Sequence, residues 1–188
     1  MEPNRIQLLL NGAWNPRIFT PPWVQRFLFE SNDPFDVLFN IDAIEFGFSQ
    51  KFISIYPSSS TIKIVCNNLK VETMEYAKKV ADRILQNLQH TPVDSAVIEL
   101  SFELKEVNAS IETIQSLKEI KVAGYGISAF KFIKIEPNIL NKEMFISLDN
   151  SNIHIQFLNK FNRDSFLENS ITETVTKNKE EVVRWVSV

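Results

Sequence analysis

The pattern of apolar and polar residues repeats along the chain. In the first half, apolar residues alternate with polar ones in four short segments, at residues 6–10, 37–41, 52–56 and 62–66. Such alternation predicts strands, because successive side chains of a strand point to opposite faces. Residues 71–89 instead carry apolar side chains at helical spacing, which predicts a long amphipathic helix. Thr20, followed by two prolines, predicts the start of a short helix.

The second half follows the same order. Its apolar pattern predicts strands at 96–104, 127–135, 144–148 and 153–157. Ser110 is placed to cap a short helix, and a polar helical segment begins at about Ser165, with Ser170 and Glu173 at capping-box spacing. The offsets between corresponding positions are nearly constant, because Ile98 follows Leu8 by 90 residues. We therefore interpret the chain as two pseudo-repeats, 1–91 and 92–188.

This pattern predicts an α+β fold in a single domain, 1–188. Each repeat reads strand–helix–strand–strand–strand–helix, and together they should form one twisted antiparallel sheet with two long helices on one face. The residues expected to be buried on that face are Ile98, Leu100, Ile146, Ile153 and Ile155. The order of elements resembles that of the TATA-box-binding-protein-like and helix-grip folds, a resemblance of topology that implies no function. The pattern leaves open whether residues 181–188 form a helix or a strand.

A short run carries a second resemblance. Leu88-Gln89-His90-Thr91-Pro92-Val93, leading into residues 96–102, resembles a segment of a sporadically distributed family of uncharacterised bacterial proteins. This resemblance covers about fifteen residues and implies a bacterial origin without implying an activity.

Composition and charge narrow the choice of function. Of 188 residues, 44% are hydrophobic, which is enough for a core, and 20 basic side chains stand against 23 acidic ones. Without an excess of cations we expect neither a nucleic-acid partner nor a membrane partner. The single cysteine, Cys66, and two histidines argue against disulfides and structural zinc. We therefore expect a cytoplasmic protein without cofactor, metal or catalytic residue.

Two groups of residues are candidates for binding a partner. The first comes from an aromatic segment, where a turn at 33–36 should project Phe29 or Phe35 towards the surface, although a core role for these aromatics is the alternative. The second group is Glu99, Glu103 and His154, which should share the free face of the sheet. Glu99 and Glu103 would lie about 13 Å apart along one strand, farther than paired glycosidase carboxylates, so a solvated strand face is favoured over catalysis.

These observations favour a non-catalytic protein-interaction or adaptor subunit of a cytoplasmic bacterial assembly, binding another protein or a second copy of itself. The alternative is a protein that binds a small apolar ligand in a cavity between a long helix and the sheet. An enzyme ranks third, because the sequence holds no Gly-x-Ser-x-Gly elbow and no phosphate-binding loop.

Overall fold

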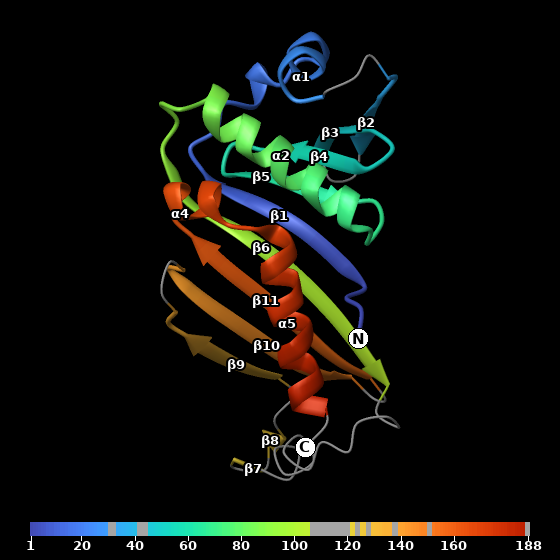
Figure 1. Cartoon of the computed structure of the whole chain (residues 1–188), viewed down its shortest axis with the longest axis vertical. Helices are drawn as coiled ribbons and strands as arrows, with labels where there is room; N and C mark the ends of the chain where they lie inside the picture. The colour runs from blue at the N-terminus through green and yellow to red at the C-terminus, as the bar shows by residue number, and fades with distance from the viewer. Residues whose placement is uncertain are drawn as a thin grey trace.

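One antiparallel sheet of nine strands organises the fold (Figure 1). The computed structural model describes residues 1–29, 33–40, 45–105, 121–122, 125–126, 129–136, 139–149 and 152–186. The spatial order of the strands is β2-β3-β4-β5-β1-β6-β11-β10-β9. Their bounds are β1 (Arg5–Gly12), β2 (Asp36–Asn40), β3 (Glu45–Ser49), β4 (Ile53–Pro57), β5 (Thr61–Cys66), β6 (Val93–Lys105), β9 (Ala129–Lys134), β10 (Asn141–Asp149) and β11 (Asn152–Phe161). A separate two-stranded sheet joins β7 (Lys121–Val122) to β8 (Tyr125–Gly126).

The centre of the sheet is the pair β1–β6, the first strands of the two halves. Leu8 of β1 lies directly opposite Ile98 of β6. β1 has β5 on its other side, and β6 has β11 on its other side. Each half therefore extends outward from the centre through antiparallel neighbours.

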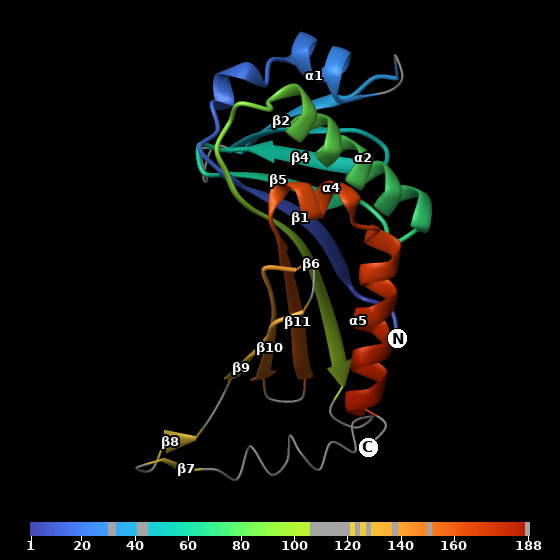
Figure 2. The same cartoon turned by 60° about the vertical axis from the view of Figure 1, so that its left-hand side comes forward.

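The long helices cover one face of this sheet, called the covered face below. α2 (Val71–Asn87) packs against β5, β1 and β4, and α5 (Ile171–Val186) packs against β6 and also contacts α2. α4 (Arg163–Glu168) contacts β6 and β11, while α1 (Pro21–Phe27) packs on α2 after the short 3-10 helix η1 (Pro16–Ile18). Figures 1 and 2 show α2, α4 and α5 on the same side of the sheet. The opposite side is called the free face.

The predicted α+β class and the antiparallel sheet are confirmed. All five residues expected on the packed face are buried, as is Ile84 in the middle of α2. Helix α1 begins after Thr20 with two prolines in its first turn. At the start of α5, the Ser170 hydroxyl accepts a hydrogen bond from the backbone N–H of Glu173, 3.3 Å away, at the predicted capping position.

Phe46, Gly47 and Phe48 belong to β3, a strand that the sequence pattern does not predict. Phe48 lies on the covered face, and Gly47 points to the other face. A Cβ at Gly47 would lie 2.8 Å from both the Ile55 carbonyl oxygen and the Tyr56 ring, so glycine allows this close approach. The first half thus has four strands between its helices rather than three.

Other boundaries differ in smaller ways. β10 and β11 are longer than predicted, the polar segment after 163 splits into α4 and α5, and α5 continues to Val186. The short helix predicted after Ser110 lies outside the described residues, as do residues 127–128 of the predicted strand 127–135. No described helix is both long and apolar enough to cross a membrane.

Candidate functional site

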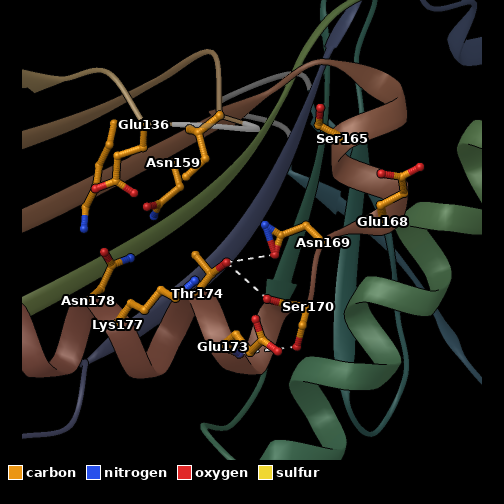
Figure 3. A pocket seen from close by; sticks show the side chains of 12 residues that line it. Glu136, Asn159, Ser165, Glu168, Asn169, Ser170, Glu173, Thr174, Lys177 and Asn178 are labelled. Carbon is orange, nitrogen blue, oxygen red and sulfur yellow. Dashed lines mark hydrogen bonds between the residues drawn. The ribbon is translucent and has the colours of Figure 1, made fainter.

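A polar cavity of about 330 Å³ lies between α4, α5 and the C-terminal half of the sheet (Figure 3). Among the described residues that line it, Ile139 is the one apolar side chain, and the others carry amides, hydroxyls, carboxylates or ammonium groups. Ligand pockets are more often lined mainly by apolar side chains. The composition of this lining therefore requires a local explanation.

The sheet supplies the first part of that explanation. One row of directly opposed residues crosses the covered face in the order Ile55, Ile64, Leu8, Ile98, Asn159 and Lys142. The row is aliphatic as far as β6 and becomes polar on β11 and β10. Because every one of these side chains is buried, the two polar residues place an amide and an ammonium group where the other half has hydrocarbon.

Lys142 is held by two partners. Its side chain is only 6% exposed, and its Nζ atom lies 2.5 Å from Glu181 Oε2 on α5. The ammonium group also lies 4.9 Å from the centre of the Phe157 ring, within reach of a cation–π interaction. Because a buried charge is tolerated only when it is paired, Glu181 neutralises Lys142 and leaves little net charge at the inner end of the cavity.

Hydrogen bonds fix the neighbouring polar side chains. Asn159 Nδ2 donates to the Ile98 carbonyl oxygen at 3.1 Å, which anchors this amide to the sheet. The Thr174 hydroxyl lies 3.0 Å from Asn169 Oδ1 and 3.1 Å from the Ser170 carbonyl oxygen, and it links α5 to the turn before it. The walls of the cavity are therefore ordered by contacts within the chain.

Asn178 is the exception. This residue of α5 is completely buried, and neither its Nδ2 nor its Oδ1 atom has a hydrogen-bond partner among the described residues. Figure 3 shows its side chain rising from α5 into the cavity, towards the sheet. A buried amide without partners costs about 1–3 kcal/mol, so both amide atoms of Asn178 would gain from a hydrogen-bonding molecule in the cavity, water included.

The outer part of the lining carries charges of both signs. Glu168, Glu173 and Lys177 are exposed. Glu136 is partly buried, and a hydrogen bond from Lys134 lowers the pKa of its carboxyl group and keeps it ionised. The outer lining thus offers both a cation and carboxylates, whereas the inner part offers neutral amides and a compensated ion pair.

The cavity is lined by hydrogen-bonding groups, and the one cysteine of the chain, Cys66, is not among its lining residues. Burial raises the pKa of the Cys66 thiol to about 12, so this thiol is protonated at neutral pH and is a poor nucleophile. Among the described residues, no group of three or more His, Cys, Asp or Glu side chains could hold a metal ion. The cavity offers hydrogen-bond donors and acceptors, and we describe it as a candidate binding site.

Phe29 does not lie at the surface, where it was one of the two phenylalanines expected, and Phe35 is only partly accessible. Phe29 is buried, and its ring lies 5.2 Å from that of Phe35, which in turn lies 6.0 Å from the ring of Phe48. Phe35 is half-buried in this cluster. The short helix does not leave these rings outside, because β3 provides an aromatic surface against which they pack.

The free-face candidates are brought onto neighbouring strands. His154 of β11 lies directly opposite Glu103 of β6, and Asn152 Nδ2 donates to Glu103 Oε1 at 3.0 Å. Glu103 is exposed and His154 is half-buried, but Glu99 is buried opposite Gln7. The expectation that Glu99 belongs to a solvated strand face is therefore wrong.

The cavity was missed by sequence reasoning, although a signal was present. Asn159 interrupts the apolar series Ile153, Ile155, Phe157 and Phe161 at a position where alternation demands an apolar side chain. Lys142 interrupts the series of Met144 and Ile146 in the same way. Polar residues in phase with an apolar series are the pattern that predicts a buried polar site.

A different feature distinguishes the outer edge of the sheet. β9 is the last strand beyond β10, and the large apolar side chains exposed on or just after it are Phe132, Ile133 and Ile135. At the other edge, β2 exposes Val37 and Phe39. No family model matches the chain, and no curated protein matches it.

Proposed function

We propose that the protein is a non-catalytic protein-interaction subunit of a bacterial cytoplasmic assembly, and that it binds an extended segment of a partner protein along β9. The observation that carries this proposal is the exposed apolar edge. Ile133 is 61% exposed and Ile135 is 85% exposed. Phe132, on the face opposite to that of Ile133, is also exposed, although its ring packs 5.6 Å from Trp185.

Edge strands of monomeric proteins are usually protected from strand addition, often by lysine side chains. β9 has two lysines, but each is held by a carboxylate of its own chain. Lys131 Nζ lies 3.0 Å from Glu143 Oε2, and Lys134 Nζ lies 2.6 Å from Glu136 Oε1. These ion pairs neutralise the charges that would otherwise repel an incoming strand.

The same contacts indicate the chemistry of the partner. A strand added to a sheet edge gains main-chain hydrogen bonds, while its alternate side chains meet the side chains of the edge strand. Apolar residues on both faces of β9 suit a partner strand that is apolar on both faces. Since the lysines are already paired, an acidic segment would gain little from them.

β9 is favoured over β2 because of how the exposed residues are distributed. Val37 and Phe39 of β2 lie opposite Phe48 and Phe46, so both belong to the same face of the sheet. β2 therefore exposes its large apolar side chains on one face, with Leu38 partly buried on the other, whereas β9 exposes such side chains on both faces.

We further propose that the chain is built from two pseudo-repeats with a TATA-box-binding-protein-like order of elements. Two observations support this. The first strands of the halves, β1 and β6, are paired at Leu8–Ile98, the positions related by the 90-residue offset. Each of these strands also has beside it the last strand before a long helix of its own half, β5 before α2 and β11 before α4 and α5.

Ile133→Lys is the variant that tests the partner-binding edge. Because Ile133 is exposed, the substitution should leave the thermal midpoint of unfolding almost unchanged. Val71→Lys is the matched control, since Val71 is 54% exposed at the start of α2, away from β9. Affinity capture with quantitative mass spectrometry should find partners that wild type and Val71→Lys retain and that Ile133→Lys loses.

Analytical ultracentrifugation of the three proteins identifies a second copy as the partner, if wild type and the control associate and Ile133→Lys does not. The proposal is wrong if Ile133→Lys captures the same proteins as wild type in the same amounts. The alternative of an apolar ligand has no support from the cavity between α5 and the sheet, because its described lining is polar.

A further inference from the structure

We propose that the cavity beneath α5 binds a small zwitterionic molecule with an uncharged amide end, of the class formed by amino acids with carboxamide side chains. The proposal is independent of partner binding at β9. It rests on three observations: the unpartnered amide of Asn178, the compensated charge at the inner end of the cavity, and the mixed charges at its outer end.

Asn178 indicates which chemical group of the ligand lies at the inner end of the cavity. Its amide offers a donor, Nδ2–H, beside an acceptor, Oδ1, and both atoms are buried without a partner among the described residues. The group that satisfies both atoms together presents an acceptor beside a donor in the reverse order. A primary carboxamide has this arrangement, whereas a carboxylate has only acceptors and an ammonium group has only donors.

The surroundings of Asn178 argue against a charged group at the inner end. Lys142 is already paired with Glu181 at 2.5 Å, and Asn159 Nδ2 is already bonded to the Ile98 carbonyl oxygen. A second carboxylate would compete with Glu181 for one buried ammonium group, and a second cation would compete with Lys142. A neutral amide avoids both costs.

The outer end suits a pair of opposite charges. Lys177 is exposed there and can attract a carboxylate, while Glu168 and Glu173 are exposed there and can attract an ammonium group. A zwitterion meets both requirements at one end of the molecule.

The size and lining of the cavity restrict the class further. Its volume of about 330 Å³ is at the lower end of the range for pockets that hold small ligands, about 300–1,000 Å³. No aromatic side chain is found among the described lining residues, so there is no ring on which a nucleobase or a sugar would stack. A short, flexible, hydrogen-bonding ligand fits these limits.

The test compares L-glutamine with two probes of similar size, L-glutamate and L-norleucine. Isothermal titration calorimetry and thermal shift on the full chain should detect L-glutamine, with much weaker responses to the other two. In ¹⁵N NMR spectra of the wild-type protein, the side-chain amide signals of Asn178 should move with L-glutamine. This last measurement needs no variant and reports the contact directly.

Asn178→Leu should reduce the affinity for L-glutamine by at least about tenfold, because two hydrogen bonds are lost. The matched control is Gln7→Met, which also removes a buried side-chain amide with an unpartnered oxygen but does so on β1, away from the cavity lining. This control should bind L-glutamine as wild type does.

Three outcomes would overturn the proposal: no binding of L-glutamine at millimolar concentration, equal binding of all three probes, or unchanged binding by Asn178→Leu. The NMR measurement on wild type keeps the test decisive even if Asn178→Leu folds poorly. None of these outcomes bears on strand addition at β9, which the Ile133→Lys experiment decides separately.

Discussion

The two long helices solve the same packing problem in different ways. α2 covers β5 and β1 with an apolar surface, and its buried residues other than Thr73 and Lys78 are apolar. α5 covers its part of the sheet with a mixture of apolar residues and the buried polar residues Thr174 and Asn178. The sheet residues beneath the helices differ as well, since Ile64 and Leu8 lie on the N-terminal side and Asn159 and Lys142 on the C-terminal side. The N-terminal interface between helix and sheet is therefore mainly apolar and is called the dry interface below, whereas the C-terminal half encloses polar groups.

The two interfaces contribute differently to stability. Dry packing under α2 contributes to folding and offers no group for recognition. The polar groups under α5 lower stability, because amides and ammonium groups must give up water. Such groups are typical of binding sites, where function is favoured at the expense of stability. Substitutions in each half test this difference between the two helix–sheet interfaces.

The largest effect is expected for Ile84→Ala in α2. Ile84 is a completely buried residue of α2. Truncation of such a side chain leaves a cavity that the surroundings fill only in part. The free energy of unfolding should fall by about 2–5 kcal/mol. Urea denaturation followed by circular dichroism measures this, and a loss below about 0.5 kcal/mol would show that the dry interface lies elsewhere.

Asn178→Leu should have the opposite sign. It replaces an unpartnered buried amide by an apolar side chain of similar size, so the free energy of unfolding should rise by about 1 kcal/mol in the absence of ligand. The same urea titration measures it. A clear loss of stability would mean that the amide of Asn178 is already satisfied, and the contrast between the two halves would then disappear.

Glu143→Gln tests a buried charge of the C-terminal half by its pH dependence. A hydrogen bond from Lys160, 2.6 Å away, lowers the pKa of the Glu143 carboxyl from its ordinary value of 4.5. The stability contributed by a carboxylate with a lowered pKa is present above the unfolded value, near 4.5, and is lost as the pH falls through the lower folded value. The fall in thermal midpoint between pH 7 and pH 3 should therefore be smaller in the variant.

Asp82 has the opposite effect on the pH dependence of stability. Burial raises the pKa of its carboxyl group in spite of its bond to Lys78. Protonation of Asp82 at low pH favours the folded state, but this contribution is common to wild type and to Glu143→Gln. It cancels when the two pH profiles are subtracted. Parallel profiles for the two proteins would contradict the role given to Glu143.

The smallest effect concerns Cys66 in the dry half. With its thiol buried and its pKa raised to about 12, Cys66 should react with iodoacetamide at pH 8 only when the chain unfolds. Mass spectrometry should show no alkylation of the native protein over a period in which the urea-unfolded protein is fully alkylated. Rapid alkylation under native conditions would show that the N-terminal half opens more readily than its packing indicates.

Sequence patterns predict most strands and the long helix α2 of this fold, but they do not predict the candidate binding site. The strands that hold Ile98, Ile146 and Ile155 follow from alternation, and α2 follows from its helical period, because both patterns arise from local geometry. The sequence does not predict strand β3, because Gly47 between Phe46 and Phe48 has no side chain and is typical of loops. The function of Gly47 depends on Tyr56, a partner that only the folded sheet brings close.

The candidate site depends on contacts that no local pattern contains. Lys142 and Glu181 are 39 residues apart in the chain, and Asn159 bonds to Ile98, 61 residues away. Their partnership results from the order of strands in the sheet. Phe29 and Phe35 show the same limit in reverse, since local reasoning expected one of the two at the surface, with a core role as the alternative. Tertiary packing buries Phe29 and half-buries Phe35.

The pairing of Leu8 with Ile98 has a consequence for how the chain reaches its folded state. β1 is made first, but its neighbour β6 follows about 90 residues later. During synthesis, the edge of β1 that pairs with β6 therefore stays unpaired until β6 has been made. Leu8 lies on this unpaired strand. Contacts between residues so far apart slow folding, and edges left open meanwhile favour association with other chains. The seam that unites the two halves can thus close only after β6 has been made, before β9, β10 and β11 join the sheet, and the interval before it closes is when the N-terminal strands most need protection.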